Sequence, residues 1–234
     1  MRRVDPEAIR RTFDAESDAV LVFYVRTVER ILKTPTGKAD LSRLSELVFI
    51  QAYIAFEGLL ADLFRAYINR DPAAFLSETN ARIAQSIKDK FGQWHADRLS
   101  FSSYRHIASQ EIPLLLDRTG RNLTFPSADA LQQRAQAWLA PQFAQKFAAL
   151  RHEDLLVINA AKAMRDFIAH RSAAARATMN AVLAAIPKSP PTAGLGRGNK
   201  RVLSLGTFLK APLASRGRRV TIYMGLLRSI ASRL

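Results

Sequence analysis

The stretch from residue 40 to residue 69 most constrains what this chain can fold into. Apolar residues recur there at intervals of three and four, which is the spacing of one side of a helix. They form two adjacent stripes that together cover a face too wide for a helix lying on a surface. We therefore expect the central helix of an all-α bundle. The first stripe holds Ile50, Ile54, Ala61, Phe64 and Ile68, and the second holds Phe49, Tyr53, Phe56, Leu60, Leu63 and Tyr67.

An acid interrupts the first stripe. Glu57 lies between Ile54 and Ala61. A buried carboxylate without a partner is very costly, so Glu57 is expected to be paired or neutral. Alternatively, it lies at the edge of the stripe and reaches solvent.

Helical spacing continues through most of the chain, and no pattern favours strands. Asp5 and Pro6 are typical of a helix start, and that helix is expected to end near Leu32. Pro113 is expected to stop a helix, and Ser127 to cap one. Further helices are predicted over residues 72–78, 80–91, 104–111, 127–139, 142–152, 153–169 and 172–186, with a loop at 119–126. A single helix over 142–169 fits the pattern as well as two with a bend near His152.

Charge is divided unevenly along the chain. All 20 acids lie in residues 1–166, together with 23 lysines and arginines. Residues 167–234 carry 12 lysines and arginines and no acid. This distribution favours a surface that meets phosphates or an acidic partner. A solubilising tail is the alternative.

Proline and glycine are concentrated in residues 187–198, which indicates a linker. We therefore expect a helical domain over residues 1–186 and a tail over residues 187–234. The tail holds a short apolar segment at 202–209 and a basic amphipathic stretch at 218–234. That stretch suits a membrane surface, a protein partner or RNA.

Several classes of site lack their residues in this sequence. There is no cysteine, which excludes disulfides and thiolate sites and fits an intracellular compartment. The four histidines are dispersed, and glycine-rich phosphate loops and hydrolase or kinase signatures are absent. No uncharged apolar run reaches the roughly 18 residues of a membrane span, and the basic amino end lacks the apolar core of a secretory signal. We expect a cytoplasmic protein with no metal and no cofactor.

One cluster combines residues suited to chemistry on RNA. Arg165, Asp166 and His170 lie at the end of an apolar helical stretch, and Arg171 follows. Cleavage of RNA by its own 2′-hydroxyl needs a base, an acid and positive charge beside the phosphorus, without a metal. His170 can act as base or acid, and Arg165 offers a charged fork to phosphate oxygens. Asp166 could orient either residue, and Arg171 could add a phosphate contact.

A purely structural interpretation of the cluster stays open. His170 would then be a cation favoured by the dipole at a helix C-terminus. Arg165 would pair with Glu57 or Asp166 and hold two helices together.

The segment Arg165-Asp166-Phe167-Ile168-Ala169-His170 resembles the motif of HEPN domains, in which an arginine and a polar residue precede a histidine by a fixed interval. The order of elements is also similar: a long first helix, a wide apolar second helix bearing an acid, and a late helix that ends in the motif. The resemblance covers about residues 5–186. Asp166 departs from the asparagine that is usual in the family, and the stretch between the second helix and the motif is long.

HEPN domains are small helical bundles, and many are metal-independent endoribonucleases of toxin–antitoxin and antiviral defence systems. The resemblance, closest to the RiboL-PSP and toxin-like members, implies an enzyme of this kind. Arg165, His170 and Asp166 would be catalytic, with Glu57 and Arg171 in support. RNA, and an acidic antitoxin or a nucleotidyltransferase-like protein, would be its partners.

Other functions fit the same residues. HEPN-like modules without catalysis exist, and such a module would bind RNA, an acidic antitoxin or a membrane surface through the basic tail. A helical DNA-binding regulator is a third class, but the sequence shows no compact helix-turn-helix spacing.

The spacing of the motif leads to a prediction about assembly. Five residues separate Arg165 from His170, which places them about 140° apart on a regular helix. They would diverge too far to hold one phosphate. Either the helix ends or distorts between them, or a second copy of the chain completes the site. HEPN ribonucleases resemble the second case, so we expect a homodimer.

Overall fold

The computed structural model describes residues 3–102, 104–116, 123–213 and 216–234, and these residues form eleven α-helices and no strand. The predicted all-α class is therefore confirmed. The chain divides into two compact units. Unit 1 comprises residues 1–7 and 60–149, and unit 2 comprises residues 8–59 and 150–234.

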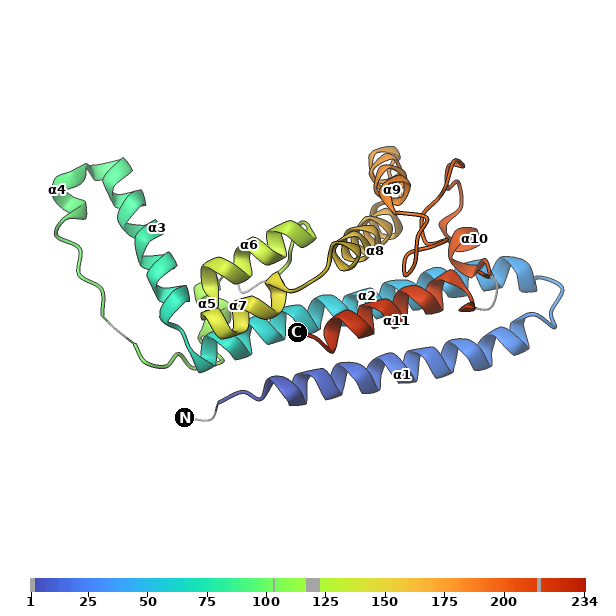
Figure 1. Cartoon of the computed structure of the whole chain (residues 1–234), viewed down its shortest axis with the longest axis horizontal. Coiled ribbons are helices and arrows are strands. Elements are labelled where there is room, and N and C mark those ends of the chain that lie inside the picture. Colours follow the sequence, from blue (N-terminus) through green and yellow to red (C-terminus); the bar gives the residue numbers. More distant parts are fainter. Residues whose placement is uncertain (1–2, 103, 117–122, 214–215) are drawn as a thin grey trace. The chain divides into compact units, whose positions relative to one another are not determined.

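The two longest helices, α1 (Pro6–Ile31) and α2 (Gly37–Arg70), contribute residues to both units. In unit 2 they run antiparallel (Figure 1). The ring centroids of Phe13 and Phe56 are 6.2 Å apart, and the hydroxyls of Tyr24 and Ser45 share a hydrogen bond of 2.9 Å. The predicted start of α1 at Pro6 and the predicted apolar helix over 40–69 are both present.

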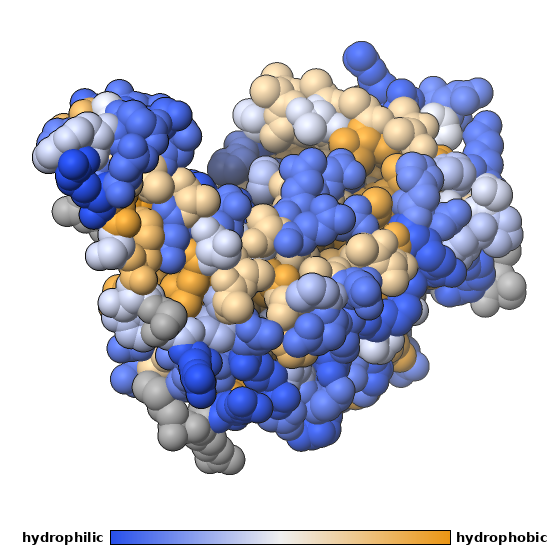
Figure 2. All heavy atoms as spheres, turned by 60° about the vertical axis from the view of Figure 1, so that its left-hand side comes forward, coloured by the Kyte–Doolittle hydropathy of each residue, from blue (hydrophilic) through white to orange (hydrophobic). Residues whose placement is uncertain are grey.

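Part of the apolar face of α2 remains uncovered. Leu47 and Ile54 are 66% and 53% exposed, although the pattern placed Ile54 in the core. Periodicity indicates which residues share a side, but not how far the covering helices extend. On the face shown in Figure 2, apolar residues form patches that hydrophilic residues interrupt.

In the described part of the chain, α2 is also the one helix long and apolar enough to cross a membrane by length and composition. Core helices pass the same test. Of its most apolar 18-residue window, 56% is buried inside the fold.

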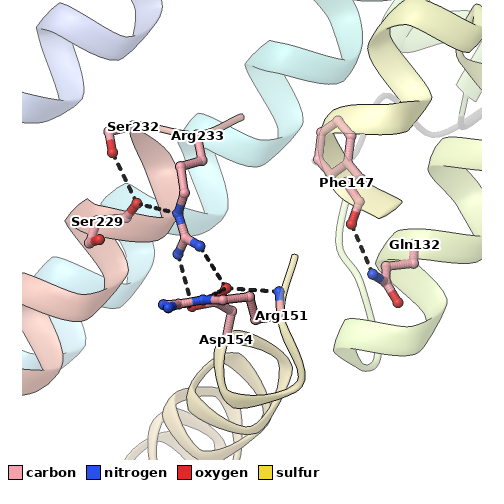
Figure 3. Close-up of polar contacts among 7 residues, drawn as sticks. All are labelled: Gln132, Phe147, Arg151, Asp154, Ser229, Ser232 and Arg233. Atoms are coloured by element: carbon pink, nitrogen blue, oxygen red, sulfur yellow. Dashed lines mark hydrogen bonds and ion pairs between the residues drawn. The ribbon is translucent and has the colours of Figure 1, made fainter. Parts of the chain in front are cut away.

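Unit 1 is built on an aromatic core around the C-terminal part of α2. The ring centroid of Phe64 lies 4.9 Å from that of Phe125 and 5.0 Å from that of Phe147, and Tyr67 stacks on Phe143. The Nε2 of Gln132 donates to the carbonyl oxygen of Phe147, which ties two helices together (Figure 3). The helices of this unit after α2 are α3 (Ala73–Phe91), α4 (Gln93–Ala96), α5 (Ile112–Leu116), α6 (Ala128–Trp138) and α7 (Pro141–Ala148).

Three predictions for unit 1 need correction. The helices expected over 72–78 and 80–91 are one helix, α3. No helix forms over the described residues of 104–111. Instead α5 begins at Ile112, with Pro113 in its first turn, where proline's missing N–H breaks no hydrogen bond. The short helix α4 was not expected. Of the loop predicted at 119–126, residues 119–122 lie outside the described residues.

The predicted cap at Ser127 is present. The Oγ of Ser127 accepts a hydrogen bond from the backbone N of Ala130 at 3.1 Å and starts α6. After α7, Leu150 and Arg151 are not helical, and the next helix begins at His152. Of the two alternatives for 142–169, two helices is therefore correct.

Unit 2 joins most of α1 and α2 to the C-terminal helices. Tyr223, fully buried, packs the edge of its ring on Phe49 at 5.9 Å and donates its hydroxyl to the carbonyl of Leu195. Arg228 binds Asp14 and Asp18 of α1. The basic stretch at 218–234 thus forms a helix whose apolar side is buried. The C-terminal helices are α8 (His152–His170), α9 (Ala173–Ala185), α10 (Leu205–Lys210) and α11 (Arg219–Ala231).

A buried carboxylate fastens the start of α8 to the segment after α11 (Figure 3). Asp154 accepts two hydrogen bonds of 2.8 Å from the guanidinium of Arg233, and further bonds from the backbone and side chain of Arg151. Burial opposes ionisation of Asp154. The hydrogen bonds from Arg233 and Arg151 outweigh it and lower the pKa of Asp154 to about 2.

The proline- and glycine-rich segment at 187–198 is packed within unit 2. Thr192 and Leu195 are fully buried. Arg216 donates to the backbone carbonyls of Pro191 and Ala193. Some of the arginines after residue 167 therefore hold backbone in place, because irregular backbone has carbonyl groups that need donors.

Candidate functional site

The helix that carries the motif is regular throughout the motif. α8 continues to His170 and ends at Arg171, the residue after it, whose φ of 50° lies in the left-handed region. The helix therefore neither ends nor distorts between Arg165 and His170. The two side chains leave α8 about 140° apart.

Arg165 points to α2, where it meets the acid of the apolar stripe. Its Nη2 lies 3.5 Å from Oε2 of Glu57, and its Nη1 lies 3.1 Å from Oδ1 of Asp166. The expected partner for Glu57 is therefore present, and its side chain is only 18% exposed. Within one chain, Arg165 therefore pairs with Glu57 and Asp166 and links α8 to α2. This is the contact that the structural interpretation of the cluster predicts.

The carboxylates around Arg165 influence one another. Burial raises the pKa of Glu57, the cations Arg165 and Lys162 lower it, and Asp166 raises it further; the net direction is upward. The Nζ of Lys162 lies 2.6 Å from Oδ2 of Asp166, so Asp166 has two cationic partners, Lys162 and Arg165. Tyr53, buried beside this group, also has a raised pKa, chiefly through burial and then through Glu57. The cluster is a partly buried network of charged side chains in which burial favours the neutral form of Glu57.

His170 lies apart from this network. Its side chain is exposed, and it makes no hydrogen bond or ion pair with any residue that the structure describes. The structure brings Arg165, Asp166 and Glu57 together but does not bring His170 to them. The imidazole is open to solvent and to a ligand.

Arg171 is held by an acid that the sequence did not single out. Its guanidinium binds the carboxylate of Glu46 and lies 5.4 Å from the ring of Phe167. Glu46 also accepts a hydrogen bond of 2.8 Å from the backbone N of Gly206, at the start of α10. The available signal was spacing: Glu46 precedes Glu57 by about three helical turns, which puts both acids on one side of α2.

The uncovered apolar residues of α2 are close to the cluster in helical position. Leu47 and Ile54 are exposed, and their angular positions on the helix lie within about 80° of that of Glu57. These two exposed apolar side chains, about two helical turns apart with Gln51 between them, lie beside the side of α2 that binds Arg165 and are called the exposed strip.

Among the described residues, no three histidine, aspartate or glutamate side chains gather in a way that could hold a metal ion. The chemistry available to the cluster is proton transfer by His170 and Glu57 and charge stabilisation by the arginines.

Comparisons with models of protein families, with curated proteins and with solved structures found no match to this chain.

Proposed function

We propose that this protein is a cytoplasmic, metal-independent endoribonuclease of the HEPN type, active as a homodimer in a toxin–antitoxin or antiviral defence system. The observation that carries the proposal is the arrangement at α8: a partly buried arginine held between two carboxylates, and an exposed histidine five residues later on the same helix. These are the residue types that 2′-hydroxyl attack on RNA requires.

A second copy resolves the divergence of Arg165 and His170. In a two-fold dimer, His170 of one chain faces the phosphate held by the other chain, and the reverse contact is made by symmetry. The exposed strip with Leu47 and Ile54 supplies the apolar surface for such an interface.

Glu57 regulates the availability of Arg165 in this scheme. A phosphate must compete with Glu57 and Asp166 for the guanidinium, and burial favours the neutral form of Glu57. Protonation of Glu57 on arrival of the phosphate releases Arg165 to stabilise the charge on the phosphorane. His170 takes the 2′-hydroxyl proton or supplies one to the leaving 5′-oxygen.

The first test is a nuclease assay on single-stranded RNA in EDTA. His170→Ala should abolish cleavage and leave the dimer folded. His95→Ala, which removes another exposed histidine, should cleave as the parent protein does. Undiminished cleavage by His170→Ala would sink the proposal.

The second test addresses the dimer. Ile54→Glu puts a charge on the exposed strip and should give a folded monomer without activity, as measured by sedimentation and the same assay. Leu114→Glu changes a residue that is 67% exposed in unit 1 and should leave both properties unchanged. A monomer that cleaves RNA as fast as the parent contradicts the two-chain site.

A second candidate is a HEPN-like module that binds RNA without cleaving it. The engagement of Arg165 by two carboxylates within one chain favours it. RNA binding without any turnover, in the parent protein and in His170→Ala alike, would identify this function. Membrane binding through the tail has less support, because the apolar side of α11 is buried in unit 2.

A further inference from the structure

A cleft with four arginines opens in unit 2 beside the end of α8. Its volume is about 650 Å³, and it lies between α9 and residues 197–203. No carboxylate lines it; its charged side chains are Arg171, Arg176, Arg197 and Arg201. Arg171 directly follows His170, so the cleft begins next to the motif.

The two walls of the cleft are fastened together by a buried asparagine. Asn180 of α9 accepts a hydrogen bond of 2.8 Å from the backbone N of Val202 and donates one of 3.2 Å to its carbonyl. Arg197 donates from Nε to the backbone carbonyl of Asn180 at 2.8 Å. These bonds fix the segment opposite α9, so the cleft is formed before any ligand arrives.

Three of the four arginines have no acidic partner among the described residues, and the guanidinium groups of two of them, Arg176 and Arg201, make no hydrogen bond there either. Arg171 is paired with Glu46, and Arg197 binds backbone carbonyls. Arg176 lies 5.4 Å from the Phe167 ring, and both it and Arg201 are exposed. The charges of Arg176 and Arg201 are therefore not paired within the described chain and are free to bind an anionic ligand, and a guanidinium fork matches phosphate oxygens.

The lining also indicates which part of a nucleic acid would be recognised. No aromatic side chain lines the cleft, so it offers bases no aromatic ring to stack on. No carboxylate is present to accept hydrogen bonds from base or sugar. Ala173 and Ala177 place the positive N-terminal end of the 13-residue helix α9 at the same wall. Phosphates are what this lining suits.

We propose that the cleft binds the phosphodiester backbone of single-stranded RNA, without regard to sequence, and positions the strand beside His170. The inference rests on the proposed function for the nature of its ligand. It adds a binding surface built partly from residues after 187, which lie outside the resemblance to HEPN domains.

Binding is measured with a short 2′-O-methyl RNA, which lacks the attacking hydroxyl and cannot be cleaved by this route. The full chain is titrated by fluorescence anisotropy over a series of salt concentrations. The paired variant Arg176→Gln/Arg201→Gln should weaken binding about tenfold or more. It should also lower the magnitude of the salt slope by about 1.4, at roughly 0.7 for each lost contact to a single strand.

A second variant tests the cleft from the opposite direction. Ala177→Glu places a carboxylate on an exposed position of the wall and should repel the strand without disturbing a helix. The matched control, Arg26→Gln/Arg30→Gln, removes the same charge from exposed positions of α1 and should change the Kd less than twofold. Circular dichroism checks that each variant is folded.

Three results would overturn the inference: equal weakening by the control pair, binding insensitive to the cleft variants, or competition by inorganic phosphate as effective as that by RNA of equal phosphate content. The outcome is separable from that of the proposed function. Cleft-dependent binding without cleavage of ordinary RNA refutes the nuclease and keeps the cleft. Cleavage of RNA together with binding that the cleft variants leave unchanged refutes the cleft and keeps the nuclease.

Discussion

Replacing Asp154 with asparagine should cost this protein a measurable part of its stability. Asp154 holds Arg233 and Arg151 at the start of α8 (Figure 3), and its pKa is about 2 against the ordinary 3.8. Each pKa unit is worth about 1.4 kcal/mol, so ionised Asp154 stabilises the fold by about 2 kcal/mol. Asparagine keeps one acceptor oxygen but loses the charge that two guanidinium groups share.

The sign of the pH dependence follows from the lowered pKa. Above about pH 4 the carboxylate is ionised in both states and the stabilisation is complete. As the pH falls from about 4 to 2, the unfolded chain takes up the proton first and the stabilisation is lost. Asp154→Asn should therefore be about 2 kcal/mol less stable at pH 7, and the difference should largely vanish near pH 2.

Urea unfolding followed by far-ultraviolet circular dichroism, at neutral and at acid pH, measures both effects. Glu153→Gln changes the neighbouring acid, for which a loss within about 0.5 kcal/mol is expected. If Asp154→Asn matches the parent protein at pH 7, or differs by the same amount at both pH values, the assignment of this stability to the ionised carboxylate is wrong.

Four further substitutions test other contacts. Because burial raises the pKa of Glu57, the parent protein should lose stability as the pH rises above about 4.5, and Glu57→Gln should lack this slope; equal slopes would argue against the buried acid. Gly206→Ala would place a methyl group 2.4 Å from the carbonyl oxygen of Ser42, which is shorter than any normal contact, so a loss of about 1 to 3 kcal/mol in urea unfolding is expected. At Gly58 an added methyl group would meet no atom within 4 Å, so Gly58→Ala should instead stabilise α2 by about 0.5 to 1 kcal/mol. A change in the free energy of unfolding of the same sign for both glycine variants would contradict this reasoning. Arg228→Gln should cost about 1 kcal/mol or less, since its pair with the aspartates of α1 is half exposed; a larger loss would mean that the pair is better shielded than its exposure indicates.

Local chemistry in the sequence predicted most helix starts. Pro6 and Ser127 mark the beginnings of α1 and α6, because each suits a first turn or a cap through interactions within a few residues. The same proline chemistry misled at Pro113. A proline fits both the first turn of a helix and the residue after a helix, and only packing around the fully buried Ile112 decided between them.

The sequence predicted contacts of the candidate site only where its residues lie on helices with a clear apolar periodicity. An acid on an apolar stripe needs a partner, so Glu57 and Arg165 could be paired from the sequence. Glu46 with Arg171, and the four arginines of the cleft, depend on how an irregular segment folds back on α9. The proline and glycine content of residues 187–198 indicated a linker there. Composition alone does not tell whether such a segment is packed, as Leu195 is.

The contacts of α11 also set an order of events during synthesis. Unit 1 takes nearly all its residues from 60–149, so its core can close as soon as that stretch leaves the ribosome. The core of unit 2 cannot, because Phe49 packs on Tyr223 and Asp14 binds Arg228, and both partners are made near the end of the chain. Arg233, which binds Asp154 at the start of α8, also follows α11, so this contact forms only after residue 233 has been made.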